Sequence, residues 1–381
     1  MTVNDKISKS GIFLFLGAGA SSPFGGWLMS EFIANVMSQL HTNRDLYDLL
    51  GTLAHYADYD LEGILKELGD ICNKRYFADK SRINYINNFL DSELEQEERN
   101  KEREKTKAQG IGGGYVGSVK EISGFSKRYG ELVKKCKELR TDIEIQIFEH
   151  YGNLDNSLVV ETYKPVFDIL LGSLNEDKIL PIFMTNYDRI IEYYRESENE
   201  KVCMIDGFGE MVPDSGERIW NRNVFDNFQA EQGKPNIVLF KLHGSIYWYE
   251  KNKRIVYAPI AIQRGPKERI KNVLIYPAMY KIATNEPFFT GYDYFQRCLD
   301  NAELGIFIGY SFRDYDTVTK IRSSLNFNSK LTLIILDPNA EKLVADNFAG
   351  FKNRFMSLKY SFGRKTDIDN YLEQIKKALE K

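Results

Sequence analysis

Three polar side chains in this sequence could take part in chemistry: the imidazole of His243, which is suited to proton transfer, and the amide of Asn186 and the carboxylate of Asp188, which can face a pocket. An imidazole has an ordinary pKa of about 6.5, so it can exchange a proton at neutral pH. Asn186 and Asp188 lie two residues apart in Thr185-Asn186-Tyr187-Asp188, so both can face one pocket from a single turn. The alternatives are an Asx turn or helix cap for this pair and a structural role for His243.

A short glycine- and serine-rich segment, Gly17-Ala18-Gly19-Ala20-Ser21-Ser22, is suited to binding a pyrophosphate. Gly17 and Gly19 permit a tight turn and close approach of the backbone, and Ser21 or Ser22 can hydrogen-bond a phosphate or a ribose. The alternative is a tight turn without a ligand. A dehydrogenase would place a strand ending in Asp or Glu about 20 residues later. Here Ser38–Leu50 has helical spacing instead, which argues against that class.

A literal GxGxxG motif occurs at Gly112–Gly117, but its context is wrong for a phosphate site. The dinucleotide-binding motif needs a strand before it and a helix after it. A charged run with helical character precedes this one. The segment is therefore predicted to be a loop.

The polar clusters follow short apolar runs, which are predicted to be buried parallel strands because they are apolar on both faces. In an open α/β sheet, ligands bind beyond the carboxyl ends of the strands. Two further clusters fit this position: Gly309 and Ser311 offer close backbone approach and a hydroxyl, and Asp337 can meet a ribose or an adenine. The predicted strands are Ile12–Leu16, Ile179–Met184, Ile237–Leu242, Leu304–Ile308 and Leu331–Leu336.

The long interval between the first two predicted strands has helical rather than strand periodicity. A simple βαβ crossover needs only about 30 residues. The sequence therefore predicts an α/β fold: a Rossmann-like parallel sheet flanked by helices, with a large helical insertion after the first strand. The expected domains are residues 1–40 with 165–381, and an inserted helical subdomain, 41–164, that carries a charged and Gly-rich arm, 91–117.

Two other segments differ in pattern. Glu210–Gly233 has mixed polarity without a clear period, which predicts a loop region. Ile368–Leu379 has apolar residues along one side, which predicts an amphipathic helix that covers the edge of the sheet.

The composition excludes several classes of protein. The 381 residues include 51 Lys and Arg and 54 Asp and Glu, a net charge of −3, and the basic residues are spread along the chain. Neither nucleic acid nor a membrane surface is therefore an expected partner. The four cysteines form no CxxC pair, so we expect no disulfide framework and no metal site, and a cytoplasmic location.

The ordered motifs GAGAS, TNYD, LHG and GYS, each after an apolar run, resemble the sirtuin-like family, and most closely its prokaryotic branch that hydrolyses NAD in antiphage defence. The resemblance implies Asn186, His243 and Asp188 as catalytic residues. It also implies an NAD-binding role for the residues at the other strand ends: Gly17, Ala18, Gly19, Ser21, Thr185, Gly309, Ser311 and Asp337.

Two departures from the family pattern bear on the activity. Sirtuin deacylases place two CxxC pairs after the catalytic histidine to bind zinc, whereas only Cys298 follows His243. They also have a glutamine where this chain has Thr185. The expected activity is therefore an NAD+ glycohydrolase that releases nicotinamide and ADP-ribose and depletes NAD in abortive infection. The alternatives are an NAD-dependent protein deacylase and a sensor subunit that binds NAD or ADP-ribose without turnover.

An uncontrolled NAD hydrolase would starve its host, so control by assembly is expected. The resemblance implies a homo-oligomer and a separate regulatory partner, such as a HerA-like ATPase. The helical insertion and its charged arm are the expected contact surfaces.

Overall fold

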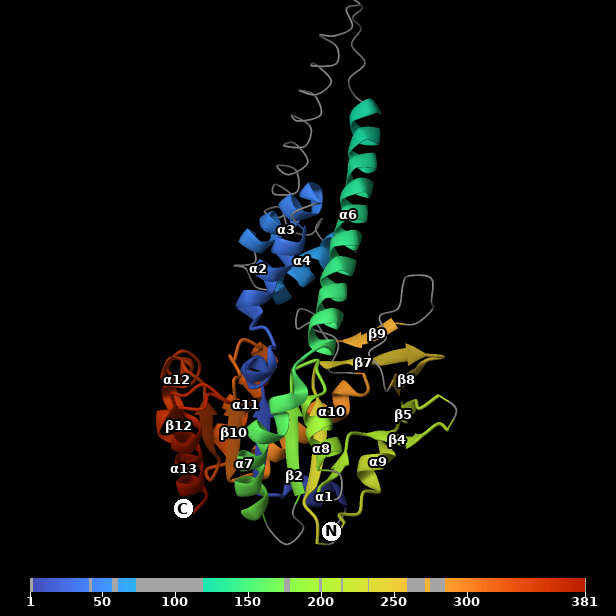
Figure 1. Cartoon of the computed structure of the whole chain (residues 1–381). Coiled ribbons are helices and arrows are strands. Elements are labelled where there is room, and N and C mark those ends of the chain that lie inside the picture. The colour runs from blue at the N-terminus through green and yellow to red at the C-terminus, as the bar shows by residue number, and fades with distance from the viewer. Residues whose placement is uncertain are drawn as a thin grey trace, which may run out of the picture. The chain divides into compact units, whose positions relative to one another are not determined.

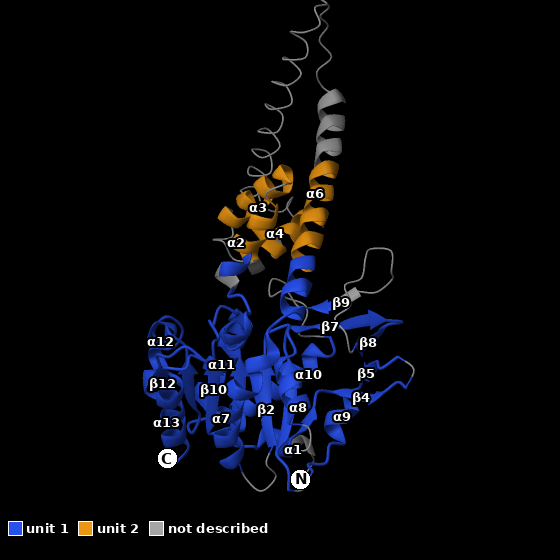
Figure 2. Cartoon of the chain, in the orientation of Figure 1, with its two compact units in different colours: residues 1–32, 145–381 blue, residues 33–144 orange. Residues whose placement is uncertain are grey.

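The computed structural model describes residues 3–40, 43–56, 61–72, 119–174, 179–198, 201–213, 215–231, 233–258, 271–274 and 285–380. The chain divides into two compact units, Met1–Phe32 with Ile145–Lys381 and, between them in sequence, Ile33–Glu144 (Figure 2). The predicted arm, 91–117, and the GxGxxG segment within it lie outside the described residues.

The first unit contains a parallel sheet whose strands follow the order β12-β11-β10-β1-β2-β6-β3 (Figure 1). All neighbouring pairs in it are parallel, which confirms the predicted Rossmann-like α/β class. Three predicted strands have the bounds observed, and two are shifted at their ends by one residue. The strands are β1 (Ile12–Leu16), β2 (Ile179–Met184), β3 (Cys203–Ile205), β6 (Asn236–Lys241), β10 (Leu304–Ile308), β11 (Thr332–Leu336) and β12 (Phe355–Leu358).

Helices cover both faces of this sheet, which is why its strands are apolar throughout. Alternate residues of β1 enter different cores: Leu14 and Leu16 pack on one face, Phe13 and Phe15 on the other. The first face packs against α7 (Val159–Gly172), α8 (Ile190–Ser197) and α13 (Ile368–Leu379). The helix α13 has the predicted bounds, but it packs into the core on this face, whereas the prediction placed it over the edge of the sheet. The second packs against α1 (Val3–Ser8), α9 (Asn223–Asp226), α10 (Phe288–Asn301), α11 (Tyr315–Phe327) and α12 (Ala340–Phe348), which the 3₁₀ helix η7 (Ala349–Arg354) follows.

A second, antiparallel sheet has the order β4-β5-β8-β7-β9. It shows that the prediction of a loop over Glu210–Gly233 was wrong, since β5 and α9 lie inside that segment. The two strands in or next to that segment, β4 and β5, are short and largely exposed or half-exposed, so they lack the continuous apolar runs that identified the parallel strands. The strands of this sheet are β4 (Phe208–Met211), β5 (Arg218–Trp220), β7 (Gly244–Lys251), β8 (Arg254–Tyr257) and β9 (Lys271–Leu274).

Between β1 and β2, the described residues contain helices only, in agreement with the predicted helical insertion. In the second unit, the leucines of α3 at 46, 49, 50 and 53 are buried, as helical spacing predicts. No helix in the described part of the chain is long and apolar enough to cross a membrane. The elements of this interval are η1 (Ala18–Ala20), η2 (Ser22–Phe24), α2 (Met29–Gln39), α3 (Arg44–Tyr56), α4 (Leu61–Cys72), α6 (Val119–Gly152), η5 (Asn156–Leu158) and α7.

Candidate functional site

The carboxyl ends of four neighbouring strands, β10, β1, β2 and β6, bring most of the predicted site residues to one edge of the parallel sheet. Backbone hydrogen bonds continue past the strand ends. Gly17 N donates to Ile308 O at 3.0 Å, and Thr185 N donates to Leu16 O at 3.1 Å. Leu242 N donates in the same way to the carbonyl that ends β2, at 2.8 Å. Three turns are therefore held side by side: the glycine turn (Gly17–Ser22), the Asn186 turn (Thr185–Asp188) and the His243 turn (Leu242–Ser245).

The glycines of this edge pack against one another. A Cβ on Gly17 would lie 2.5 Å from Gly309 O, and one on Gly19 would lie 2.7 Å from Gly309 Cα. Gly309 itself has φ +59°, in the left-handed region that favours glycine. Its own Cβ would lie 2.4 Å from Gly19 Cα. Contact between two backbone turns therefore requires glycine at these positions, whether or not a phosphate also approaches them.

A buried hydrogen-bond network joins the first two turns. Asn186 Nδ2 donates to Gly17 O at 2.8 Å and to Ser21 Oγ at 2.6 Å. Ser21 Oγ in turn donates to Asp188 Oδ2 at 2.6 Å, and Ile190 N donates to Asp188 Oδ1 at 3.0 Å. Asp188 is 1% exposed. Both carboxylate oxygens have partners inside the protein, so Asp188 orients Ser21 and, through it, Asn186.

One atom of the Asn186 amide is available to hydrogen-bond a ligand. Both protons of Nδ2 are used within the protein, so the carbonyl oxygen Oδ1 is the atom that can accept a hydrogen bond from a bound molecule. The side chain is buried, which limits its freedom further. Asn186 is thus presented as a fixed acceptor.

The imidazole of His243 lies in a second polar cluster. Its Nε2 lies 3.3 Å from the hydroxyl of Tyr292 and 3.8 Å from Asp314 Oδ2. The Tyr292 hydroxyl donates to Asp314 Oδ2 at 3.4 Å. Burial raises the pKa of Tyr292 well above its ordinary value, so this hydroxyl remains a donor. The cluster joins the end of β6 to α10 and to the turn after β10.

Asp314 is held as a carboxylate. Burial alone raises its pKa, but interactions with His243 and hydrogen bonds from Thr317 outweigh burial and lower the pKa to about 2. Thr317 Oγ1 donates to Oδ2 at 2.6 Å. The other oxygen, Oδ1, accepts the backbone N–H of Asp316 at 3.0 Å and so caps α11. A negative charge therefore lies beside His243 at neutral pH.

Three predicted residues are less closely tied to this centre. Thr185 lies in the Asn186 turn and bonds Leu16 through its backbone. Ser311 is exposed. Asp337 Oδ1 accepts the N–H of Asn339 at 2.7 Å within its own turn, and burial raises its pKa.

The predicted site residues include neither Tyr292 nor Lys241, and the sequence assigns Asp314 no role in the site. Tyr292 lies in a helix with several aromatic residues, where its spacing gives no distinguishing signal. Lys241 had a visible signal, because it ends an otherwise apolar strand, Asn236–Lys241. A lysine buried at that point needs a partner, and its partner is Glu192, 2.8 Å away.

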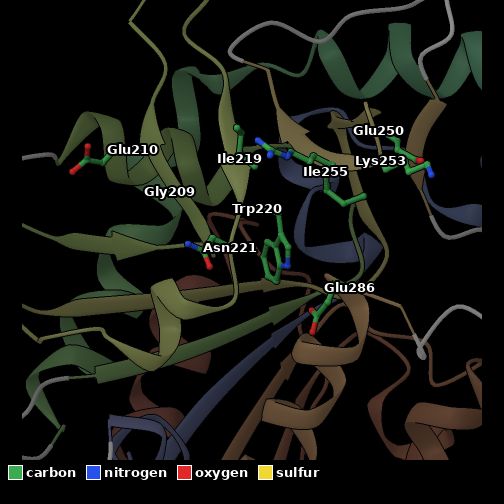
Figure 3. Close-up of a pocket in the computed structure, with 10 residues that line it drawn as sticks. Gly209, Glu210, Ile219, Trp220, Asn221, Glu250, Lys253, Ile255 and Glu286 are labelled. Carbon is green, nitrogen blue, oxygen red and sulfur yellow. The ribbon is translucent and has the colours of Figure 1, made fainter.

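A separate hollow of about 680 Å³ lies on the antiparallel sheet (Figure 3). Glu286, which precedes the N-terminus of α10, is one of its lining residues. Trp220 Nε1 and Glu286 Oε2 are buried there without a hydrogen-bond partner among the described residues. This hollow contains none of the predicted site residues. It is lined by Gly209, Glu210, Ile219, Trp220, Asn221, Glu250, Lys253, Arg254, Ile255 and Glu286.

In the residues that the structure describes, no three His, Cys, Asp or Glu side chains form a group that could hold a metal ion. Cys298, the cysteine after His243, is buried, and its thiol lies 3.8 Å from the carbonyl oxygen of Ile7. Burial raises the pKa of this thiol. Cys298 is therefore placed as a core residue.

A comparison with curated proteins gave no match. Among solved structures, a Sir2 homologue in complex with NAD is 13% identical, with a TM-score of 0.41, over 99% of this chain and 94% of that one. A Sir2 homologue mutant in complex with 2′-O-acetyl ADP-ribose is 12% identical, with a TM-score of 0.42, over 99% of this chain and 96% of that one. Similarity at this level decides neither ligand nor activity. The sequence itself matches the family described as SIR2-like domain over residues 181–356, a span that includes Asn186, His243 and Gly309.

Proposed function

We propose that this chain is an NAD+ glycohydrolase. The observation that carries the proposal is the placement of Asn186 and His243 on adjacent turns of one sheet edge, each held by its own buried hydrogen-bond network. Binding alone does not need an amide acceptor and an imidazole fixed on neighbouring turns. The match of residues 181–356 to the SIR2-like domain family supports NAD as the substrate.

The proposed reaction converts NAD+ and water into nicotinamide, ADP-ribose and a proton. The bond between nicotinamide and ribose breaks, and a bond forms between the ribose carbon and the water oxygen. Nicotinamide leaves a pyridinium as a neutral molecule, so its departure needs no general acid. The transition state resembles an oxocarbenium ion, as in other glycoside cleavage.

In this scheme Asn186 and His243 act on the attacking side. Asn186 Oδ1 accepts a hydrogen bond from the water or a ribose hydroxyl, because its Nδ2 protons are already used. His243 accepts a proton, directly from water or through a ribose hydroxyl. Its Nε2 faces Tyr292 and Asp314, so Nδ1 is the nitrogen that takes the proton.

The remaining predicted residues have supporting roles in the proposal. Asp188 is a positioning residue, because Ser21 and Ile190 occupy both of its oxygens. The backbone of Gly17, Ala18 and Gly19 faces the phosphates, with Thr185, Gly309, Ser311 and Asp337 along the rest of the edge. No metal ion takes part.

The test is nicotinamide release from NAD by the purified chain, followed by chromatography. His243→Ala and Asn186→Ala should each lower turnover by about 100-fold or more while the fold is retained. Two matched exposed variants outside the site, His55→Ala and Asn326→Ala, should keep wild-type turnover. Wild-type turnover in both site variants would refute the assignment.

The same assay separates the alternatives. Nicotinamide release that requires an acyl-lysine peptide would identify a deacylase instead. NAD or ADP-ribose binding without release, both alone and with a co-purified genomic neighbour, would identify a sensor subunit.

We further propose that this activity depletes NAD in the cytoplasm during antiviral abortive infection. Such an activity needs control, so a homo-oligomer and a regulatory partner such as a HerA-like ATPase are part of the proposal. Size-exclusion chromatography with and without the neighbouring gene product tests this point. A monomer under both conditions would count against it.

A further inference from the structure

Lys241 is the last residue of β6 and lies two positions before His243. Its side chain is 1% exposed. The Nζ atom lies 2.8 Å from Glu192 Oε1, and it donates hydrogen bonds to Ser245 Oγ at 3.3 Å and to the backbone carbonyl of Asp188. An ammonium group has three N–H donors. These three acceptors therefore match the full set of donors.

The acceptors of Lys241 include one atom in each of the two turns that carry Asn186 and His243. The Asp188 carbonyl ends the turn that carries Asn186, and Ser245 follows His243 by two residues. The ammonium group therefore links the segment that presents the amide to the segment that presents the imidazole.

A second link runs beside it. Ser245 Oγ donates to Tyr187 O at 3.1 Å, and Ile246 N donates to the same carbonyl at 3.2 Å. The parallel pairing of β2 with β6 ends at the pair Met184 and Lys241. Beyond that pair, side-chain hydrogen bonds from Lys241 and Ser245 connect the Asn186 turn to the His243 turn.

We propose that Lys241 is a positioning residue for NAD cleavage: it fixes the Asn186 turn against the His243 turn through the Asp188 carbonyl and Ser245. This inference rests on the proposed function. The geometry argues for more than packing, because a buried ion pair contributes little net stability compared with apolar residues of similar volume. Here the ammonium group of Lys241 hydrogen-bonds the backbone carbonyl of Asp188, in the turn that carries Asn186. A shift of about 1 Å in the position of a reacting group can lower turnover about 100-fold.

The test removes the ion pair without leaving a lone buried charge. The double variant Lys241→Met with Glu192→Gln keeps the side-chain volumes and is expected to fold. Its kcat should fall about 100-fold while KM for NAD stays within about threefold, because the double variant does not change the glycine turn that is proposed to bind the phosphates. The matched control is Lys251→Met with Glu217→Gln, an ion pair of 2.9 Å at the other end of β7. That control should keep wild-type kcat.

A second readout does not depend on activity. Amide hydrogen exchange at Ile246, whose N–H bonds Tyr187 O, should become about tenfold faster in the Lys241 double variant and stay unchanged in the Lys251 control. If the wild-type chain fails to cleave NAD, both alone and with its co-purified genomic neighbour, the proposed function falls while exchange still tests the link. If the double variant keeps wild-type kcat and exchange, the inference about Lys241 falls while the proposed function stands.

Ser245→Ala covers the case in which the double variant does not fold. Ser245 is fully buried, and the change removes one hydroxyl without adding volume. We expect kcat to fall about tenfold at unchanged KM, with faster exchange at Ile246. Wild-type kcat and exchange in a folded Ser245→Ala variant would overturn the proposal.

Discussion

His243 Nε2 and Asp314 Oδ2 lie 3.8 Å apart, although their strands are not neighbours in the sheet. His243 follows β6 and Asp314 follows β10, and β1 and β2 lie between these strands. Tyr292 from α10 contacts both residues. This cluster therefore connects the two sides of the edge at which the glycine turn and the Asn186 turn meet.

Replacing Asp314 with Asn should lower the free energy of unfolding in a pH-dependent way. The folded-state pKa of Asp314, about 2, lies below its ordinary value of 3.8. A depressed carboxylate pKa stabilises the fold above the unfolded-state pKa, and this stability is lost as the pH falls toward the folded-state pKa. Asp314→Asn should therefore cost about 2 kcal/mol above pH 4, and the difference should shrink toward pH 2.

Urea unfolding of the wild type and Asp314→Asn across this pH range measures the effect. Asp316→Asn is the matched control, since it is exposed and sits in the same first turn of α11. A constant difference between wild type and Asp314→Asn at every pH would contradict the expected linkage.

Removal of the Tyr292 hydroxyl should affect turnover more than stability. Tyr292→Phe keeps the buried ring but deletes the group that lies 3.3 Å from His243 Nε2 and donates to Asp314. His243 would then be oriented by the carboxylate alone, and we expect kcat to fall about tenfold at unchanged KM. Steady-state nicotinamide release measures both constants. Tyr315→Phe, at an exposed position, should behave as wild type.

Deleting the Ser21 hydroxyl should loosen Asn186. The hydroxyl accepts from Asn186 Nδ2 and donates to Asp188 Oδ2, so Ser21→Ala leaves one donor and one carboxylate oxygen without their partner. A buried group left unpaired costs about 1–3 kcal/mol. We expect that loss in thermal or urea unfolding, with at least a tenfold fall in kcat. The neighbouring exposed Ser22→Ala is the control, and equal effects of both changes would contradict the network.

The parallel sheet was predictable because its strands are buried on both faces, so Ile12–Leu16 and Leu304–Ile308 appear in the sequence as unbroken apolar runs. The antiparallel sheet was not predictable from the sequence. Arg218–Trp220 has only three residues, all half-exposed, and its pairing partner, Arg254–Tyr257, is distant in sequence. A strand that depends on such a partner leaves no periodic signal in its own residues.

The candidate site was predictable in part for the same reason. Asn186 and His243 follow recognisable strands, so a common edge could be expected for them. The contact of His243 with Asp314 depends on the order of the strands and on the register of the helix that carries Tyr292. A single sequence specifies neither, and Asp314 also has an ordinary local role as the cap of α11.

Gly309→Ala should be among the most destabilising single changes in the chain. Gly309 has φ +59°, which costs a residue with a Cβ about 1–2 kcal/mol. The added Cβ would lie 2.4 Å from Gly19 Cα, and backbone on both sides leaves no flexible side chain to move away. We expect a loss of at least about 3 kcal/mol in the free energy of unfolding, measured by urea titration. Gly350→Ala is the matched control, because a Cβ there meets nothing within 4 Å. A Gly309→Ala variant as stable as Gly350→Ala would show that the two turns are not packed backbone against backbone.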